Sequence, residues 1–526
     1  MKLPVFNRRS FLRLCLGAPL FALTSCLNFN SKSKNSLRMP IGSEPPTLDW
    51  NLATDSVSFR VITNIMEGLA QFDENLKPVP AVAKSWDTSN YGQTYTFQLR
   101  KDVFWSDGKG VTAKDFEYSW KRLLAPQTAA EYAYFLYDIE NAQAYNAGEI
   151  ADHSRLGIRS VDDFTLEVKL RRPLAYFPSL VTFMVTFPMR QDIVEKFGDT
   201  WTDPTHIVTN GPFLLRDWRH EYKVTLEPNP HYFEGKPLLK KVEMFVVEQP
   251  FTSLTLYEMN EVDMTSLPPM DIMRYTKDPE YINYPLLSSF YFGFNVKKEP
   301  FTDVRIRKAF SMAMDRKEFP KILKGGEIPS SSWIPKGMFG YDPGLGLNYD
   351  PQGAKDLLSE TGYPEGKGFP EVTLVFNSSP TNQLIAEKAQ EQWKRNLGIS
   401  AKLENMEWKV FLEKLNQDPP ALYRLGWNAD FPDPDNFMNL FLAQSGNNHT
   451  NWENPKYDEL VVKAAEEIDH KIRLQMYQEA QRILCREDVP IMPLYTSAQN
   501  LLVKRRVKGF RPNAMDILYL KRLKLE

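Results

Sequence analysis

The stretch EVTLVFNSSPTNQLIAEKAQEQWKRNLGISAKLENMEWKVFLEKLNQDPPALYRLGWNAD, residues 371–430, alternates short apolar runs with longer amphipathic segments. The apolar runs have the length of buried strands. They span residues 371–376, 399–405 and 421–427. After the first run, Ser379 is a preferred helix cap, Pro380 fits the first helical turn, and Gly398 ends the helix. The order strand–helix–strand–helix–strand predicts a parallel sheet with right-handed crossovers, and therefore an α/β fold.

The third predicted strand runs into RLGWNADFPDPDNF, residues 424–437, which carries opposite charges six positions apart. Arg424 falls near the carboxyl end of the predicted strand, and Asp430 falls in the loop beyond it. Open α/β sheets bind their ligands at this edge. The position therefore predicts a binding site here, without identifying the ligand.

The rest of the chain reads as further strands and helices. Runs at 95–100, 164–170, 223–228 and 241–247 alternate apolar and polar residues, as half-buried strands do. Thr112 followed by Asp115 approximates a capping box and predicts a helix start. A length of 526 residues exceeds what one core usually holds, so two or three domains are expected.

The first residues, MKLPVFNRRSFLRLCLGAPLFALTSC, resemble an export signal. A basic start precedes an apolar run at 14–23 that is too short to span a bilayer as a helix. Small residues before Cys26 resemble a bacterial lipobox, which implies a signal peptide at 1–25 and a lipid, including palmitate, on Cys26. NRRSFLR also resembles a twin-arginine motif, and Cys26 as an ordinary signal-region thiol is the alternative. Polar residues at 26–38 predict a flexible tether.

Composition excludes several classes of function. A formal charge of −2 indicates no nucleic-acid partner. Three cysteines and six scattered histidines show no metal-ligand or disulfide spacing, and no nucleophile or nucleotide-binding motif is present, so no metal, cofactor or catalytic residue is predicted. Cys485 is expected to be a core thiol. The basic run at 503–511 fits a solvated face better than a membrane contact. The 66 acidic residues make any carboxylate pair uninformative about glycosidase activity.

Several long strings, in order along the chain, resemble one family. They are residues 79–126, FGDTWTDPTHIVTNGPFLL (197–215), EPFTDVRIRKAFSMAMDR (299–316), LENMEWKVFLEKL (403–415) and RLGWNADFPDPDNF (424–437). They are similar to the family 5 extracytoplasmic solute-binding proteins, the peptide-binding components of ABC importers, and above all to the oligopeptide-binding members.

The resemblance implies a two-lobed, three-domain clamshell of the class II (cluster C) periplasmic-binding-protein type. Residues 39–288 with 490–526 would form an N-terminal lobe of two domains, and 289–489 a C-terminal, parallel α/β lobe. Such a protein is a monomer in the periplasm or at the cell surface, anchored to the membrane by its lipid. It would capture short peptides, deliver them to an ABC permease and catalyse no reaction.

The resemblance also implies roles for particular residues. Asp430 matches an aspartate that pairs with the peptide α-ammonium, and Arg424 matches an arginine that meets the carboxylate of a short peptide. Backbone groups of Gly426 and Asn428 would pair with the peptide as an added strand. Blocked peptide N-termini should then be rejected, because an unpaired charge in a closed cleft costs about 2–5 kcal/mol.

Trp408 matches a pocket tryptophan of the family and Tyr132 matches a cleft tyrosine, whereas Trp427 is next to the site by sequence. Burial in the core is the alternative for the two tryptophans, and a loop or cap carboxylate is the alternative for Asp430. Asn382 stands where the family has a carboxylate-binding histidine, and a nearby lysine would be Lys321 or Lys324. These departures leave peptide length open.

Three competing functions remain at this stage. One is a dedicated receptor for murein tripeptide, or for another small ligand such as a metal chelate or a sugar; a free amine partner for Asp430 argues against sugar. Another is a peptidase or glycosidase, for which no motif is present. The third is an adhesin or chaperone-like surface protein that uses the same cleft.

Overall fold

The structure is a computed structural model that describes residues 36–174, 176–467 and 469–526. The predicted signal peptide, lipidation at Cys26 and most of the tether lie outside the described residues. Within the described ranges, no helix has both the length and the apolar character needed to cross a membrane.

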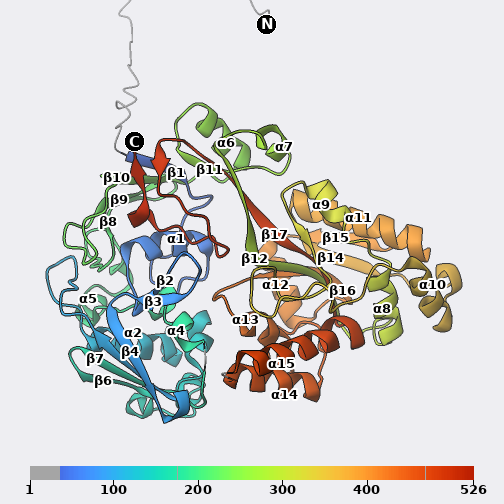
Figure 1. Ribbon diagram of the computed structural model, residues 1–526, viewed down its shortest axis with the longest axis horizontal. Helices are drawn as coiled ribbons and strands as arrows, with labels where there is room; N and C mark the ends of the chain where they lie inside the picture. Colours follow the sequence, from blue (N-terminus) through green and yellow to red (C-terminus); the bar gives the residue numbers. More distant parts are fainter. Residues whose placement is uncertain (1–35, 175, 468) are drawn as a thin grey trace, which may run out of the picture.

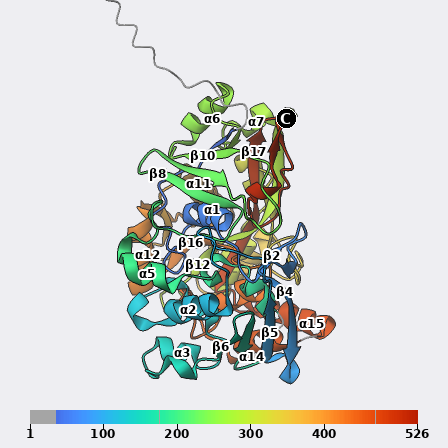
Figure 2. The ribbon, with the colours of Figure 1, turned by 90° about the vertical axis from the view of Figure 1, so that its left-hand side faces the viewer.

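Two long antiparallel strands join two groups of elements (Figure 1). They are β12 (Tyr281–Phe294) and β17 (Ile491–Val503). We call the elements before β12, with the segment after β17, the first lobe, and the elements between these strands the second lobe. Figure 2 shows the first lobe from its outer side, with its sheets and helices stacked along its length.

The first lobe contains two four-stranded sheets, ordered β1-β10-β9-β8 and β4-β5-β7-β6. Their strands are β1 (Ser36–Pro40), β10 (Lys241–Phe245), β9 (Lys223–Pro228), β8 (Phe213–Arg219), β4 (Ala83–Ser89), β5 (Thr94–Leu99), β7 (Thr165–Lys169) and β6 (Ile158–Asp162). The other elements are α1 (Ser56–Ile65), β2 (Ala70–Phe72), β3 (Pro78–Pro80), α2 (Ala113–Leu124), α3 (Ala142–Asn146), α4 (Phe177–Leu180), α5 (Gln191–Phe197), α6 (Pro250–Glu258), β11 (Met264–Ser266), α7 (Ile272–Tyr275), β18 (Val507–Lys508) and β19 (Lys524–Leu525). All four strands predicted in this part are confirmed, as is the capping box of Thr112 and Asp115 at the start of α2.

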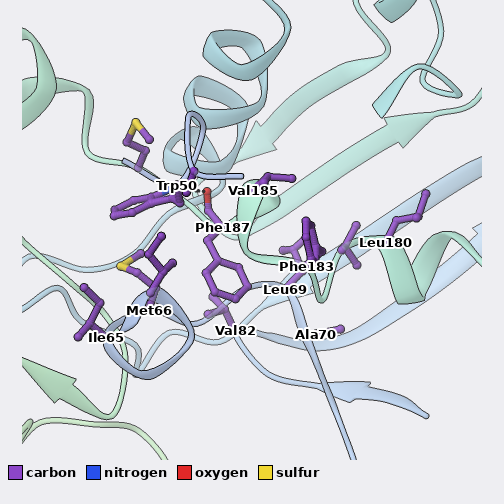
Figure 3. Close-up of a cluster of buried hydrophobic side chains, with 14 of the residues drawn as sticks. Trp50, Ile65, Met66, Leu69, Ala70, Val82, Leu180, Phe183, Val185 and Phe187 are labelled. Atoms are coloured by element: carbon purple, nitrogen blue, oxygen red, sulfur yellow. Dashed lines mark hydrogen bonds between the residues drawn. The ribbon is translucent and has the colours of Figure 1, made fainter. Parts of the chain in front are cut away.

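The core of the first lobe is a continuous set of buried apolar side chains (Figure 3). Trp50, Phe183 and Phe187 come from separate segments and meet there, and the Trp50 indole donates to the Phe187 carbonyl at 3.3 Å. Full burial of such side chains contributes roughly 1.5–3 kcal/mol each. This packing fixes Phe183, on whose ring Tyr132 packs.

The second lobe is built on a mixed sheet, ordered β11-β17-β12-β16-β14-β15 with β13 beside β17. Its elements are α8 (Val304–Met312), α9 (Glu318–Leu323), β13 (Ile328–Pro329), α10 (Pro351–Glu360), β14 (Thr373–Asn377), α11 (Pro380–Leu397), β15 (Lys402–Met406), α12 (Trp408–Gln417), β16 (Leu422–Asn428), α13 (Asp435–Met438), α14 (Pro455–Glu466) and α15 (His470–Arg482). Strand β14 pairs in parallel with β15 and with β16, which confirms the predicted arrangement. The sheet as a whole is mixed, because β12 pairs antiparallel with both β16 and β17.

The predicted boundaries of α11 are confirmed in detail. Ser379 caps the helix by accepting from the Asn382 amide, and Gly398 ends it in the left-handed conformation (φ 74°). Cys485 is buried as expected, and burial raises the pKa of its thiol to about 12.

Candidate ligand-binding cleft

Strand β16 leaves one of its edges unpaired toward its carboxyl end. Its pairing with β14 covers only Leu422 and Tyr423, whereas its pairing with β12 continues to Asn428. The Ala429 amide donates to the Leu287 carbonyl of the β12 side at 2.8 Å. Because peptide groups alternate direction along a strand, those of Gly426 and Asn428 point away from β12. No described strand pairs with that edge, so an extended chain can add to it.

Asp430 lies immediately beyond this edge and is held in place by Asn436. The Asp430 amide donates to Asn436 Oδ1 at 2.8 Å, and Asn436 Nδ2 donates to Asp430 Oδ2 at 3.3 Å. Within the described ranges, no cation forms an ion pair with the Asp430 carboxylate. Burial raises the pKa of this carboxyl to about 6, although the bonds from Asn436 and Tyr132 favour the ionised form.

Tyr132 reaches Asp430 from the first lobe. Its hydroxyl donates to Asp430 Oδ1 at 3.3 Å. Its ring packs on Phe183, with centroids 5.4 Å apart, and stacks on Tyr134 at 5.6 Å. Phe183 belongs to the core shown in Figure 3, so the core of one lobe positions a donor for a carboxylate of the other.

Arg424 is a buried guanidinium, 8% exposed, whose Nε has no hydrogen-bond partner in the described structure. It lies 4.3 Å from the Phe290 ring centroid, and no described carboxylate forms an ion pair with it. Burial raises the pKa of the Tyr495 hydroxyl, and the neighbouring Arg424 opposes that rise. A buried cation without a counter-charge is costly, so this site favours an anionic ligand group.

The other predicted residues fall into two groups. Trp427 is half-buried beside Asp430, and its indole donates to Asn436 Oδ1 at 3.2 Å. Trp408, at the start of α12, is 47% exposed and contacts Phe411 rather than the Asp430 cluster.

Three further positions bear on peptide length, namely Asn382, Lys321 and Lys324. The side-chain amide of Asn382 is occupied by two oxygens of Asn377, each at 2.9 Å, so its donor is directed into its own loop. Lys321 and Lys324 are both exposed. Whether any of the three binds the carboxylate of a longer peptide stays a prediction.

Two polar residues of the cleft were not predicted. Asn436 holds Asp430 in place. It lies in the stretch 424–437 that was singled out from the sequence, and its position after Asp-Pro-Asp could have suggested that its side-chain amide stabilises the loop. Glu327 precedes β13, which pairs with Tyr495. It accepts from the Gly325 amide at 2.9 Å, and burial raises its pKa; in the described part of the chain no cation pairs with it. Nothing in the local sequence distinguishes Glu327 from other surface glutamates.

The cleft therefore contains several groups that can contact a ligand, arranged along strand β16 and the loop after it. An unpaired strand edge lies between a half-buried carboxylate and a buried guanidinium, and aromatic rings flank it. No activated nucleophile is among the residues described around it, and the described ranges contain no cluster of three metal-binding side chains. This arrangement suits binding of an extended, zwitterionic molecule.

Comparison with known proteins gives consistent matches. Residues 77–449 match the model of the middle region of the bacterial extracellular solute-binding proteins, family 5. The oligopeptide-binding protein OppA of Bacillus subtilis is 34% identical over 497 residues, which are 91% of this chain and 91% of that protein.

Two solved structures are also similar. The murein tripeptide-binding protein MppA of Escherichia coli has a TM-score of 0.83 and 33% identity, covering 94% of this chain and 99% of that one. The Haemophilus influenzae OppA complex with the peptide RPPGFSPFR has a TM-score of 0.80 and 31% identity, covering 94% and 99%. These likenesses confirm the two-lobed α/β periplasmic-binding-protein fold. The chain therefore belongs to the family 5 bacterial extracellular solute-binding proteins, a family of binding proteins rather than enzymes.

Proposed function

We propose that this protein captures short peptides outside the cytoplasmic membrane and delivers them to the permease of an ABC importer. Asp430 pairs with the peptide α-ammonium, Arg424 pairs with its carboxylate, and the backbones of Gly426 and Asn428 pair with its main chain. Trp427, Trp408 and Tyr132 line the side-chain pockets. The observation that carries the proposal is the unpaired edge of β16 between two uncompensated charges of opposite sign.

This arrangement explains how one cleft can accept many peptides. Main-chain hydrogen bonds are available from every peptide whatever its sequence. Charge-assisted bonds at the two ends then fix the register and select molecules with a free amine and a free carboxylate. OppA, the relative described above, is named for oligopeptide binding.

The proposal extends to the parts of the chain outside the described residues. Cleavage before Cys26 and lipid attachment to its thiol would hold the protein on the outer side of a membrane, through a tether that is shorter than the predicted 26–38 because β1 begins at Ser36. We also keep the predicted division of the described chain into a lobe of 39–288 with 490–526 and a lobe of 289–489, acting as a monomer.

Glu327 favours a second candidate, a dedicated receptor for cell-wall peptide. Glu327 and Arg424 both lie near the Tyr495 hydroxyl and shift its pKa in opposite directions, Glu327 upward and Arg424 downward. A peptide that ends in diaminopimelate carries an extra ammonium and an extra carboxylate, which would match this pair. MppA, one of the similar structures described above, is named for murein tripeptide binding.

Native mass spectrometry of the purified full-length protein tests the two candidates. A mixture of short peptides released on denaturation supports a general peptide receptor, and a single mass containing diaminopimelate supports the dedicated one. If neither is present, titration with defined tri- to pentapeptides follows, and absence of binding contradicts both. The mass of membrane-extracted protein also tests lipidation, since a chain that retains residues 1–25 without added lipid contradicts the anchor.

The affinity for peptides with a free amine should fall as the pH drops below about 6. The ligand ammonium binds the ionised form of Asp430, whose pKa in the free protein is raised to about 6 by burial. Protonation therefore competes with binding, and Kd should rise about tenfold between pH 7 and pH 5. Calorimetric titration across this range measures the effect. Asp430→Asn is the matched control, because it keeps every other titrating group, and an identical pH profile in that variant would contradict the assignment.

Arg424→Gln should weaken binding of a tripeptide by about 10- to 100-fold, because a charge-assisted pair in a buried site is lost. The variant should also lose the preference for a free carboxylate over a carboxyl-terminal amide. Titration of wild-type protein and variant with trialanine and trialanine amide measures both effects. If Arg424→Gln still prefers the acid as strongly as wild-type protein does, another cation binds the carboxylate.

A further inference from the structure

We infer that Tyr176 and Asp435 form a latch that holds the two lobes closed and so sets the affinity for every ligand of the cleft. The Tyr176 hydroxyl, from the first lobe, donates to Asp435 Oδ2, in the second, at 2.7 Å. The two residues are 6% and 5% exposed, so this bond is buried between the lobes. The inference concerns how the cleft closes, and it rests on the proposed function only for its affinity measurement.

Side chains of the second lobe form a pocket for the Tyr176 ring. Phe431 stacks on it with centroids 5.1 Å apart and planes 12° apart. The Arg473 guanidinium lies 5.9 Å from the ring centroid. Arg473 itself is fixed by two bonds to Asp433, of 2.7 and 2.8 Å. The ring therefore enters a preformed site of one aromatic face and one cation.

The Asp435 carboxylate depends on the other lobe for its solvation. Arg473 is engaged by Asp433, so the described donors to the Asp435 side chain are Tyr176 and Asn439, the latter at 3.2 Å. A buried carboxylate that loses one of two donors is left partly unsatisfied. Loss of the Tyr176 bond would therefore destabilise the closed form only, because in the open form water can hydrate the Asp435 carboxylate.

The latch and the proposed peptide contact belong to one short segment. Asp430 and Phe431 follow β16, Asp435 is the first residue of α13, and Asn436 of α13 accepts from the Asp430 amide. Arg172 adds a weaker bridge between the lobes, 3.6 Å from Glu466, and is otherwise held by Asp138. A ligand that orders the Asp430 segment would also present Asp435 to Tyr176, which links occupancy to closure.

Tyr176→Phe should raise Kd about 10- to 100-fold, and by the same factor for trialanine and pentaalanine, because the closing equilibrium is common to all ligands. Asp435→Ala should match it, whereas Asp435→Asn, which keeps an acceptor for the hydroxyl, should lose much less. Tyr137→Phe is the control, since its hydroxyl bonds to Asn146 within the first lobe. Unchanged affinity in Tyr176→Phe, or a loss confined to one of the two peptides, overturns the latch.

Hydrogen–deuterium exchange of the ligand-free, full-length variants separates this inference from the proposed function. Tyr176→Phe should speed exchange in segments 176–181 and 431–438, on both sides of the contact, and leave α11 unchanged. This result supports the latch even if no peptide binds, in which case only the proposed function fails. Unchanged exchange in both segments, or faster exchange throughout the chain, contradicts a latch.

Discussion

Replacement of Asp430 by asparagine is expected to lower the affinity for a short peptide by about 2–5 kcal/mol, a factor of roughly 30 to several thousand in Kd. Asparagine has nearly the same shape and can still accept from Tyr132, so the loss isolates the negative charge. The peptide ammonium would remain in the closed cleft with no counter-charge. Isothermal titration with trialanine at pH 7.5 measures the change.

The stability of the Asp430→Asn variant provides the internal check. Burial raises the pKa of Asp430 from 3.8 to about 6, so at pH 7.5 its ionised form disfavours the ligand-free folded state, and that cost declines as the pH falls below 6 and is gone below 3.8. The variant should therefore melt at the same temperature as wild-type protein or slightly higher. Asp418→Asn, which changes an exposed carboxylate near Lys298, is the matched control. Full affinity in Asp430→Asn would refute the proposed amine contact.

Acetylation of the peptide N-terminus should reduce affinity by a similar factor with the protein unchanged. The acetyl group removes the positive charge and leaves the half-buried Asp430 carboxylate with Tyr132 and Asn436 as its donors among the described residues. Titration with N-acetyl-trialanine and trialanine measures the difference.

Combining the two changes sharpens this test. If the ammonium and Asp430 contact each other, the Asp430→Asn variant should discriminate little between the free and the acetylated peptide, and the effects should be far from additive. Additive losses would mean that the amine and the carboxylate act at separate places. A longer free peptide, pentaalanine, controls for the added size of the acetyl group.

Local chemistry made much of the second lobe predictable. The boundaries of α11 follow from Ser379, Pro380 and Gly398, each of which favours one conformation. The parallel pairing of β14, β15 and β16 follows from helices placed between strands. The long antiparallel strands β12 and β17 were not predicted, because their pairing joins residues about 200 positions apart and no turn links them.

In the candidate site too, some residues could be predicted from local sequence and others could not. Asp430 and Arg424 could be singled out, since they stand at a strand end where ligands bind and in a stretch that resembles the family. Asn436 and Glu327 could not be singled out, because an amide or a carboxylate acquires its role only from what surrounds it after folding. The sequence context of Trp408 predicts a pocket, its side chain is 47% exposed on α12, and the pocket role stays a prediction.

The unpaired edge of β16 has a consequence for the solubility of the protein. Exposed strand edges pair with one another and start aggregates, and proteins usually blunt or cover them. In the proposed function, the backbones of Gly426 and Asn428 stay unpaired to receive a peptide, so no strand of the protein itself can cover them. Tyr132 and Tyr176 of the first lobe bond to Asp430 and Asp435, just beyond this edge. We expect the first lobe to obstruct the strand of another folded molecule there, and so to shield a surface that would otherwise promote aggregation.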